Sequence, residues 1–187
     1  VSKLPGGHYM FYDLVTAQNK ISSYWQFQVT PDSDYAKSSE EELGLELRTL
    51  LTSAVKRRMV ADVPVGIFLS GGIDSSTILA CASEGEAADR IKTFSIGFHE
   101  KQFDESDIAR SIAGQFGSDH YEEIVGIDSA KEVAEHVLNM LDEPMGDSSL
   151  LPTYLLSRFA RQSVTVALGG DGGDELFAGY APFRALK

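Results

Sequence analysis

The sequence predicts an α/β fold built on a mostly parallel, doubly wound, Rossmann-like sheet. Four short apolar runs have the length and composition of strands: 65–69, 92–98, 120–125 and 164–168. Helical periodicity fills the intervals, at 75–84, 104–117, 128–141 and 152–162. Strands that alternate with helices form a parallel sheet covered on both faces. The first and last runs, VGIFL and VTVAL, are almost continuously apolar, which is typical of central strands buried on both sides.

Two further elements are predicted before this alternation begins. Residues 1–29 alternate turn signals with aromatic segments, LPGGHYMFYDL and NKISSYWQFQV, which indicates a short β-hairpin with Pro5, Gly6 and Gly7 in a turn. Ser39 and Glu42 then form a capping-box pattern at the start of a helix that runs to about Met59. The apolar residues of that helix should form one buried face: Leu43, Leu47, Leu50, Leu51 and Ala54.

Composition limits the classes of function that the chain can have. Its 187 residues are 43% hydrophobic, which is enough for a real core, and its net charge of −12 opposes binding to nucleic acid or to an anionic membrane. It has no signal peptide and no apolar stretch of membrane-spanning length, so a cytoplasmic location is the simplest expectation. Cys81 is the single cysteine, which excludes a disulfide within the chain. The start at Val1 and the abrupt end at FRALK suggest a piece of a longer polypeptide.

The loop after the first predicted strand, SGGIDSS at 70–76, has the composition of a phosphate-binding turn. Gly71 and Gly72 lack the Cβ atoms that keep a backbone away from a phosphate, and they tolerate positive φ angles, so consecutive N–H groups converge on one oxygen. The three serines add hydroxyl donors, and the following helix directs its positive end to the same point. The loop is not a Walker motif, because it lacks the GK[ST] ending, and it is not a G-x-S-x-G nucleophile elbow.

A carboxylate within this loop, Asp74, is unfavourable beside an anion unless a cation lies between them. The simpler alternative is that Asp74 caps the helix and that the glycines only turn the chain. A second loop, GGDGGDE at 169–175, follows the last predicted strand and brings Asp171, Asp174 and Glu175 together. Ligands of an open parallel sheet collect at the carboxyl ends of its strands. Two carboxylate loops at that edge therefore predict Mg²⁺ held on ATP from two sides, with a solvated acidic turn as the alternative.

The two loops carry a family resemblance. Together with KTFSIGFHEKQFDESDIARSIAGQFGSDHYE and DEPMGDSSLLPTYLLSR, they resemble the synthetase domain of glutamine-hydrolysing asparagine synthetases. These belong to the adenine-nucleotide hydrolase superfamily, whose pyrophosphate loop has the form SGGxDS. That loop alone also fits GMP and NAD synthetases, but the second loop and PTYLLS narrow the likeness to this group over 36–187. Residues 1–35 resemble the end of the N-terminal glutaminase domain and its linker, through LPGGHYM and SYWQF.

The resemblance implies an enzyme that makes an amide at the expense of ATP. The side-chain carboxylate of aspartate attacks the α-phosphorus, pyrophosphate leaves, and ammonia from glutamine displaces AMP from β-aspartyl-AMP. The implied cofactors are ATP and Mg²⁺, the implied partner is the glutaminase domain of the same full-length chain, and a homodimer is compatible with this arrangement. The family's catalytic lysine lies beyond Lys187, so this chain alone is expected to bind MgATP weakly and to be inactive.

The resemblance also assigns roles to individual residues. Pyrophosphate would be held by Ser70, Gly71, Gly72, Asp74, Ser75 and Ser76. Adenosine would lie against the backbone at Phe68 or Leu69, Ile96, Gly169 and Gly170. Mg²⁺ would be held by Asp74 and Asp174. Asp171 would be the acid/base or intermediate-positioning group, since a carboxylate near an incoming amine can accept its proton. Gly169 departs from the family, which usually has serine there.

Two other functions stay open at the level of sequence. Relatives such as β-lactam synthetases and peptide-macrocycle-forming enzymes adenylate other carboxylates, and a non-catalytic nucleotide-binding module would keep the fold alone. Asp104 and Glu105 are expected to cap a helix and His120 to be structural. Residues 142–149, DEPMGDSS, are the better candidate for the amino-acid side of the cleft.

Overall fold

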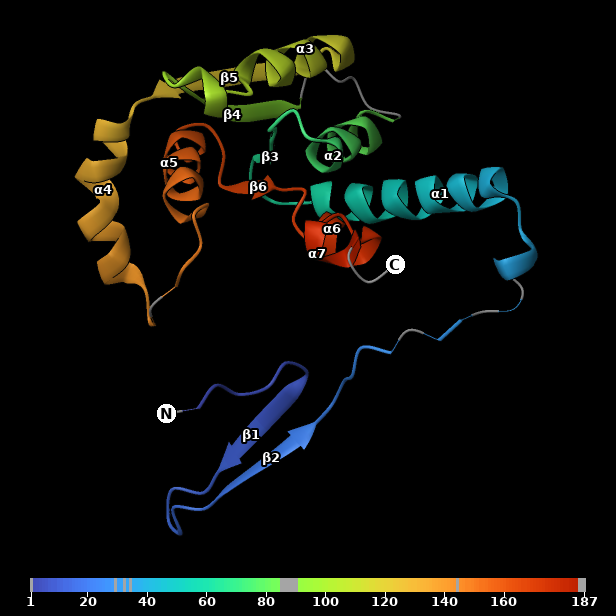
Figure 1. Ribbon diagram of the computed structural model, residues 1–187, viewed down its shortest axis with the longest axis vertical. Helices are drawn as coiled ribbons and strands as arrows, with labels where there is room; N and C mark the ends of the chain where they lie inside the picture. Colours follow the sequence, from blue (N-terminus) through green and yellow to red (C-terminus); the bar gives the residue numbers. More distant parts are fainter. Residues whose placement is uncertain are drawn as a thin grey trace. The chain divides into compact units, whose positions relative to one another are not determined.

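The computed structural model describes residues 2–28, 30–31, 33, 35–84, 91–143 and 145–184, in two compact units, Val1–Leu43 and Gly44–Lys187. Figure 1 labels the elements. The strands are β1 (His8–Tyr12), β2 (Asn19–Ser23), β3 (Val65–Phe68), β4 (Lys92–Phe98), β5 (Asp119–Val125) and β6 (Val166–Leu168). The α-helices are α1 (Glu40–Met59), α2 (Ile73–Ser83), α3 (Ser106–Phe116), α4 (Ile127–Met140), α5 (Leu150–Ala160), α6 (Gly173–Phe177) and α7 (Ala181–Arg184). Two 3-10 turns are η1 (Tyr35–Lys37) and η3 (Lys101–Phe103).

The N-terminal hairpin is confirmed, with β1 and β2 antiparallel and Met10 opposite Ile21 (Figure 1). The turn at Pro5, Gly6 and Gly7 lies before β1, because the connection between the strands is residues 13–18. Gly7 has a φ of +68°, which favours glycine. The Asp13 carboxylate orders the connection by accepting bonds from the N–H groups of Val15 and Thr16, and these bonds lower the pKa of Asp13.

The parallel sheet of the second unit has the strand order β5-β4-β3-β6, and every pairing in it is parallel. This confirms the predicted fold class. The β3 strand is internal, as its sequence predicted, but the prediction of a central strand at 164–168 is wrong within the described residues. There β6 pairs with β3 alone, and Val166 is 42% exposed. The apolar run reflects instead the packing of Val164, which is buried just before the strand begins.

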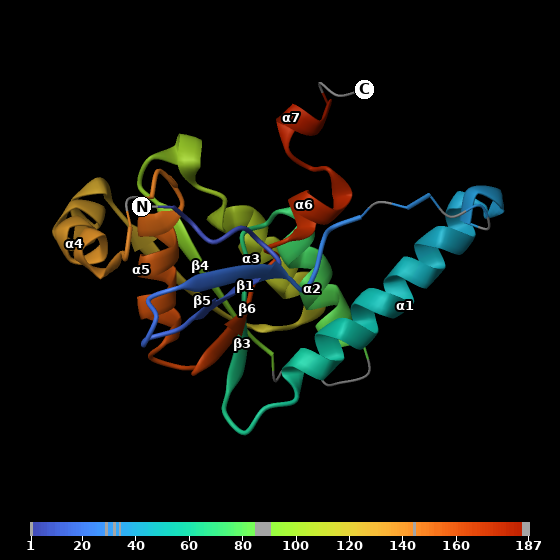
Figure 2. The same cartoon turned by 90° about the horizontal axis from the view of Figure 1, so that it is seen from below.

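Helices cover both faces of this sheet, as Figure 2 shows, with α4 and α5 on one side and α2 and α3 on the other. Successive residues of β3 point to opposite faces of the sheet. Ile67 packs with Leu79 of α2 and Ala109 of α3, whereas Phe68 packs near Ala160 of α5. The carboxyl ends of the parallel strands lie at the same end of the sheet, and the β3–α2 and β6–α6 connections both start there. The fold thereby brings the two predicted polar loops to the same end of the sheet.

The long helix α1 begins with the predicted capping box. Ser39 Oγ accepts a bond from the Glu42 N–H (3.2 Å), and Glu42 Oε2 accepts one from the Ser39 N–H (2.8 Å). The predicted buried face of this helix is largely wrong: of its five residues only Leu51 packs against the core, beside the buried Thr52 and Val55. The residues of this helix that are buried or packed against the core are Leu51, Thr52, Val55 and Met59, and this stripe starts beyond Leu43 and Leu47 and leaves Leu50 and Ala54 exposed on its other side.

The remaining sequence expectations for this unit are met at the level of elements. Leu155 is fully buried, with Leu150, Leu151 and Leu156 packed around it or its neighbours, so the predicted leucine stripe is core. Cys81 is a buried free thiol. Within the described ranges, no helix is long and apolar enough to cross a membrane.

Candidate active site

The first loop joins β3 to α2 and is shaped by glycine. Gly71 has a φ of +81°, and a Cβ atom there would lie 3.0 Å from the side chain of Ile108 in α3. Gly72 is the extended N-cap residue of α2. The N–H groups of the first turn of α2 have no partner within the helix, and the positive end of the helix dipole lies among them. The backbone therefore offers several donors to an anion.

The hydroxyl groups of this loop bond to the loop itself. The Ser70 N–H donates to Ser75 Oγ (3.2 Å), and the hydroxyl oxygens of Ser70 and Ser75 lie 3.0 Å apart. The hydroxyls of Ser75 and Ser76 both donate to the Gly72 carbonyl oxygen, at 3.2 and 2.6 Å. Ser75 is 5% exposed. The serines thus fix the turn that presents the N–H groups.

The second loop packs directly on Asp74 of the first. A Cβ atom at Gly170 would lie 2.8 Å from the Ser75 nitrogen and 2.9 Å from the Asp74 Cβ atom. One at Gly173 would lie 2.6 to 2.9 Å from the Asp74 carboxylate. Gly172, with a φ of +92°, starts the short helix α6. These glycines let the two carboxylate loops approach to backbone contact, as sequence alone could suggest but not establish.

A cavity of about 500 Å³ opens beside the two loops at this edge of the sheet. Eleven of the thirteen residues predicted for the site line it: Phe68, Leu69, Ser70, Gly72, Asp74, Ser75, Ile96, Gly169, Gly170, Asp171 and Asp174. Gly71 and Ser76 are outside the lining; one contacts α3 and the other bonds to the Gly72 carbonyl. The fold therefore gathers residues from three strand ends around one space.

The cavity is acidic. Five carboxylate residues line it, and none of the lining residues is lysine, arginine or histidine: the acidic ones are Asp74, Glu105, Asp171, Asp174 and Glu175. Within the described part of the chain, no cluster of three or more His, Cys, Asp or Glu residues has the arrangement of a metal site. Magnesium commonly takes one or two carboxylates and completes its shell with phosphates and water. Asp74 and Asp174 both line the cavity, the Asp74 carboxylate against Gly173 and the Asp174 carboxylate against Gly179, so the lining offers the two carboxylates that such a site would need.

Glu175 of the second loop is hydrogen-bonded at the cavity wall to Tyr180, which follows helix α6. The Tyr180 hydroxyl donates to Glu175 Oε1 at 2.7 Å. This bond lowers the pKa of Glu175 and raises the pKa of Tyr180. Tyr180 was not among the predicted site residues, and the sequence signal for it was only its place five residues after a carboxylate of the loop.

The predicted catalytic residue, Asp171, rests over the backbone of Gly169. A Cβ atom at Gly169 would lie 2.5 Å from Asp171 Oδ2, so the carboxylate occupies the space that a side chain at 169 would take. A side chain at 169 would require the Asp171 carboxylate to turn away, which rotation of that short side chain allows. The departure at 169 and the present placement of Asp171 are therefore coupled.

Several lining residues lay outside the predicted set, and Glu105 is the most informative. Asp104, not Glu105, caps α3, since its Oδ1 accepts bonds from the N–H groups of Ser106 (3.1 Å) and Phe98 (3.3 Å). Bonds from Ser106 lower the pKa of Asp104. Glu105 makes no side-chain cap and lines the cavity instead. The others that sequence reasoning missed are Ser95, Phe98, Ser106, Ala109, Pro152, Thr153, Leu156 and Gly172.

The signature of the family described as Asparagine synthase matches residues 46–187, which include both loops and the whole parallel sheet. The chain belongs to the asparagine synthase family. Glutamine-hydrolyzing asparagine synthetase 1 of Bacillus subtilis is 36% identical over 88% of this chain. The putative glutamine-hydrolyzing asparagine synthetase 2 of Methanocaldococcus jannaschii is 39% identical over 95% of it. The chain spans only 28% and 34% of those two proteins.

Other relatives bear on fold and on the breadth of the asparagine synthase family. Amidase chyE of Penicillium rubens is 30% identical over 99% of this chain, which spans 30% of its length. A glutamine-dependent NAD⁺ synthetase from Acinetobacter baumannii, solved with ADP, superposes with a TM-score of 0.50 at 19% identity, over 91% of this chain and 31% of that one. This last likeness shows the fold alone.

None of the described residues of 142–149, which the sequence offered for the amino-acid side of the cleft, is among the cavity-lining residues, although Asp147 is close enough to the lining residue Tyr180 to raise the pKa of its hydroxyl. Within 142–149, Asp147 Oδ1 accepts bonds from the Ser149 N–H and hydroxyl, both at 2.8 Å, just before α5. These bonds lower the pKa of Asp147. Residue 144 of this segment lies outside the described residues. In this member of the asparagine synthase family, the α5 residues that line the cavity are Pro152, Thr153 and Leu156.

Proposed function

We propose that this chain is the nucleotide-binding part of an ATP-dependent ligase that activates a carboxylate by adenylation and passes it to ammonia. The observation that carries the proposal is the cavity at the sheet edge, with a glycine-rich loop and helix N-terminus on one side and carboxylates of the second loop on the other. The favoured reaction is asparagine synthesis from aspartate with ammonia from glutamine, through β-aspartyl-AMP and release of pyrophosphate. Membership of the asparagine synthase family supports this choice.

The loop backbone would hold the pyrophosphate. N–H groups at the start of α2 would stabilise the charge that develops on it as it leaves, because they are already oriented and need no rearrangement. Ser70 and Ser75 keep that orientation through their mutual bond. The nucleoside would lie against the strand ends at Leu69, Ile96 and Gly170.

The carboxylates divide into two roles. Asp74 and Asp174 would hold Mg²⁺, which when bound neutralises phosphate charge that no cationic residue of the lining can neutralise. Asp171, placed over Gly169, would position the acyl-adenylate and accept a proton from the attacking ammonia. The Tyr180–Glu175 bond would hold the adjacent wall in place.

Residues 1–35 would be the end of a glutaminase domain and its linker, and residues 36–187 the start of the synthetase domain. The hairpin fits such a role, because both strands expose large apolar side chains, among them Phe11 at 66% and Trp25 at 57% just beyond β2. The full-length protein would then act in the cytoplasm on small molecules, with its own glutaminase domain as partner, and a homodimer would be compatible with this arrangement.

A related enzyme that adenylates another carboxylate is the second candidate. The similarity to amidase chyE, which covers almost the whole chain, favours keeping it. In that case ATP and the two loops would act in the same way, and only the carboxylate and the amine would differ.

The test uses the full-length protein with MgATP, aspartate and glutamine, and measures released pyrophosphate and asparagine. Asp74→Asn and Asp174→Asn should each lower pyrophosphate release roughly 100-fold or more, because each would weaken the binding of the Mg²⁺ whose positive charge stabilises the transition state. Asp128→Asn is the matched control: it lies on α4 outside the cavity, paired with Lys131, and should stay within about twofold of wild type. Pyrophosphate release that requires a different carboxylate would favour the second candidate. If no carboxylate supports pyrophosphate release, the proposal that the protein is an enzyme is refuted.

A further inference from the structure

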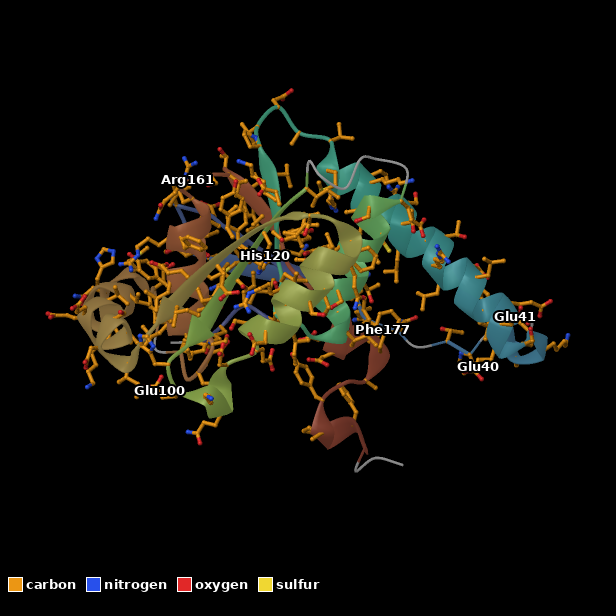
Figure 3. The ribbon with its side chains drawn as sticks, turned by 90° about the horizontal axis from the view of Figure 1, so that it is seen from above. Glu40, Glu41, Glu100, His120, Arg161 and Phe177 are labelled. Atoms are coloured by element: carbon orange, nitrogen blue, oxygen red, sulfur yellow. The ribbon has the colours of Figure 1, made fainter. Side chains whose placement is uncertain are left out.

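Polar side chains occupy the layer between the sheet and α3, where apolar ones would be expected. Thr93 is fully buried, Ser95 is 3% exposed, and the His120 side chain is 11% exposed. In the parallel register of β4 and β5, Thr93 is opposite His120 and Ser95 is opposite Glu122. All four side chains therefore lie on one face of the sheet, the face that α3 covers. Figure 3 labels His120.

These groups form a connected network around the imidazole. His120 Nδ1 lies 2.9 Å from Thr93 Oγ1, and Nε2 lies 3.3 Å from Ser95 Oγ. Glu122 Oε2 is 3.8 Å from the same Nε2, and Arg110 of α3 binds both oxygens of that carboxylate, at 2.7 and 3.0 Å. Each ring nitrogen thus has a hydroxyl partner, and the nearest charged group is already paired.

Ser95 connects this network to the cavity, because it is one of the lining residues. The same lining includes apolar residues, among them Leu69, Ala109 and, from the other face of β4, Ile96. Apolar lining does not suit a phosphate, which has the N–H groups of the first loop nearby. They suit an uncharged group that can form one hydrogen bond, such as a base or a ribose hydroxyl.

We propose that Ser95 is a binding residue for the nucleoside part of the nucleotide and that His120 is a positioning residue that fixes the Ser95 hydroxyl. The proposal rests on the ATP use proposed above. It adds a function to a histidine that the sequence marked as structural. Burying three polar side chains beneath a helix costs free energy unless they are bonded, and the network both satisfies them and orients the one that reaches the cavity.

The test is a double-mutant cycle in the full-length protein, read out as the Kd for MgATP by titration calorimetry and as KM and kcat for ATP. Ser95→Ala should weaken ATP binding about fivefold to tenfold, the effect of one lost hydrogen bond, with kcat within about twofold. His120→Phe, which removes both ring bonds, should weaken binding by the same factor. The double variant should be no weaker than either single one. His120→Gln, which can still bond to Ser95, should restore most of the affinity.

Controls separate positioning from folding. His136→Phe on α4, outside the cavity lining, should bind ATP like wild type, and circular dichroism should show each variant folded. If His120→Phe does not fold, Thr93→Val, which removes the partner at Nδ1, replaces it in the cycle. An unchanged affinity of Ser95→Ala for MgATP would overturn the proposal. So would a double variant whose loss of affinity equals the product of the two single losses. Either result leaves pyrophosphate release by wild type, and so the proposed function, untouched.

Discussion

Gly170→Ala should separate the two loops, because the added methyl group would clash with the backbone of the first loop. The added Cβ atom would lie 2.8 Å from the Ser75 nitrogen and 3.1 Å from the Asp74 carbonyl carbon, whereas ordinary contact begins at 3.4 Å. The loops must therefore move apart by about 0.6 Å at the nearest atom pair, the difference between 3.4 and 2.8 Å. Misplacement by about 1 Å costs a reaction on the order of 100-fold, so we expect kcat/KM to fall roughly 10-fold to 100-fold. Stability should fall by about 1 to 3 kcal/mol.

The assay for this variant is pyrophosphate release by the full-length protein, with Tm from calorimetry. Gly114→Ala is the matched control, since it lies in the last turn of α3 and a Cβ atom there meets nothing within 4 Å. That control should keep its activity and gain about 0.5 to 1 kcal/mol from helix propensity. A Gly170→Ala protein with wild-type kcat/KM would refute the view that the contact between the loops sets the geometry of the site.

Two further predictions concern the cavity wall and the network behind it. Gly169→Ser should displace the Asp171 carboxylate, because the new Cβ atom would lie 2.5 Å from Oδ2. This substitution should lower kcat several-fold and leave Tm nearly unchanged. A wild-type kcat would mean that Asp171 does not act from its present position. Burial lowers the pKa of His120, an effect that Glu122 opposes and Arg110 reinforces, so the unfolded chain binds the proton more tightly. The free energy of unfolding should therefore fall as the pH drops below about 6.5, and urea denaturation at pH 7.5 and 5.5 should show a smaller loss in His120→Gln.

Element type and order could be read from the sequence because local patterns decide them. Predicted strands and helices match β3 to β5 and α2 to α5 within about two residues, since strand length, helical period and capping residues are local signals. The face of α1 that is buried could not be read in this way. Leu47 and Leu50 share the helical period of Leu51, yet both are exposed, because tertiary packing selects Leu51, Val55 and Met59 as the residues of α1 that meet the core. The edge position of β6 depends likewise on strand order, which periodicity does not encode.

The candidate site shows the same division between local and nonlocal information. Glycine-rich loops after strands are recognisable in sequence, and most of the residues they supply do line the cavity. Ser95 and Tyr180 are single polar residues in ordinary surroundings, and only the pairing of β4 with β3 and the turn after α6 bring them to the same space. The acidity of the cavity follows from both sources. Its carboxylates come from two loops and from the residue just before α3, and none of the lining residues carries a cationic side chain to balance them. A polyphosphate bound there would need a metal ion to offset this negative charge, as proposed above, and the close approach of Gly170 and Gly173 keeps the Asp74 carboxylate next to the second loop.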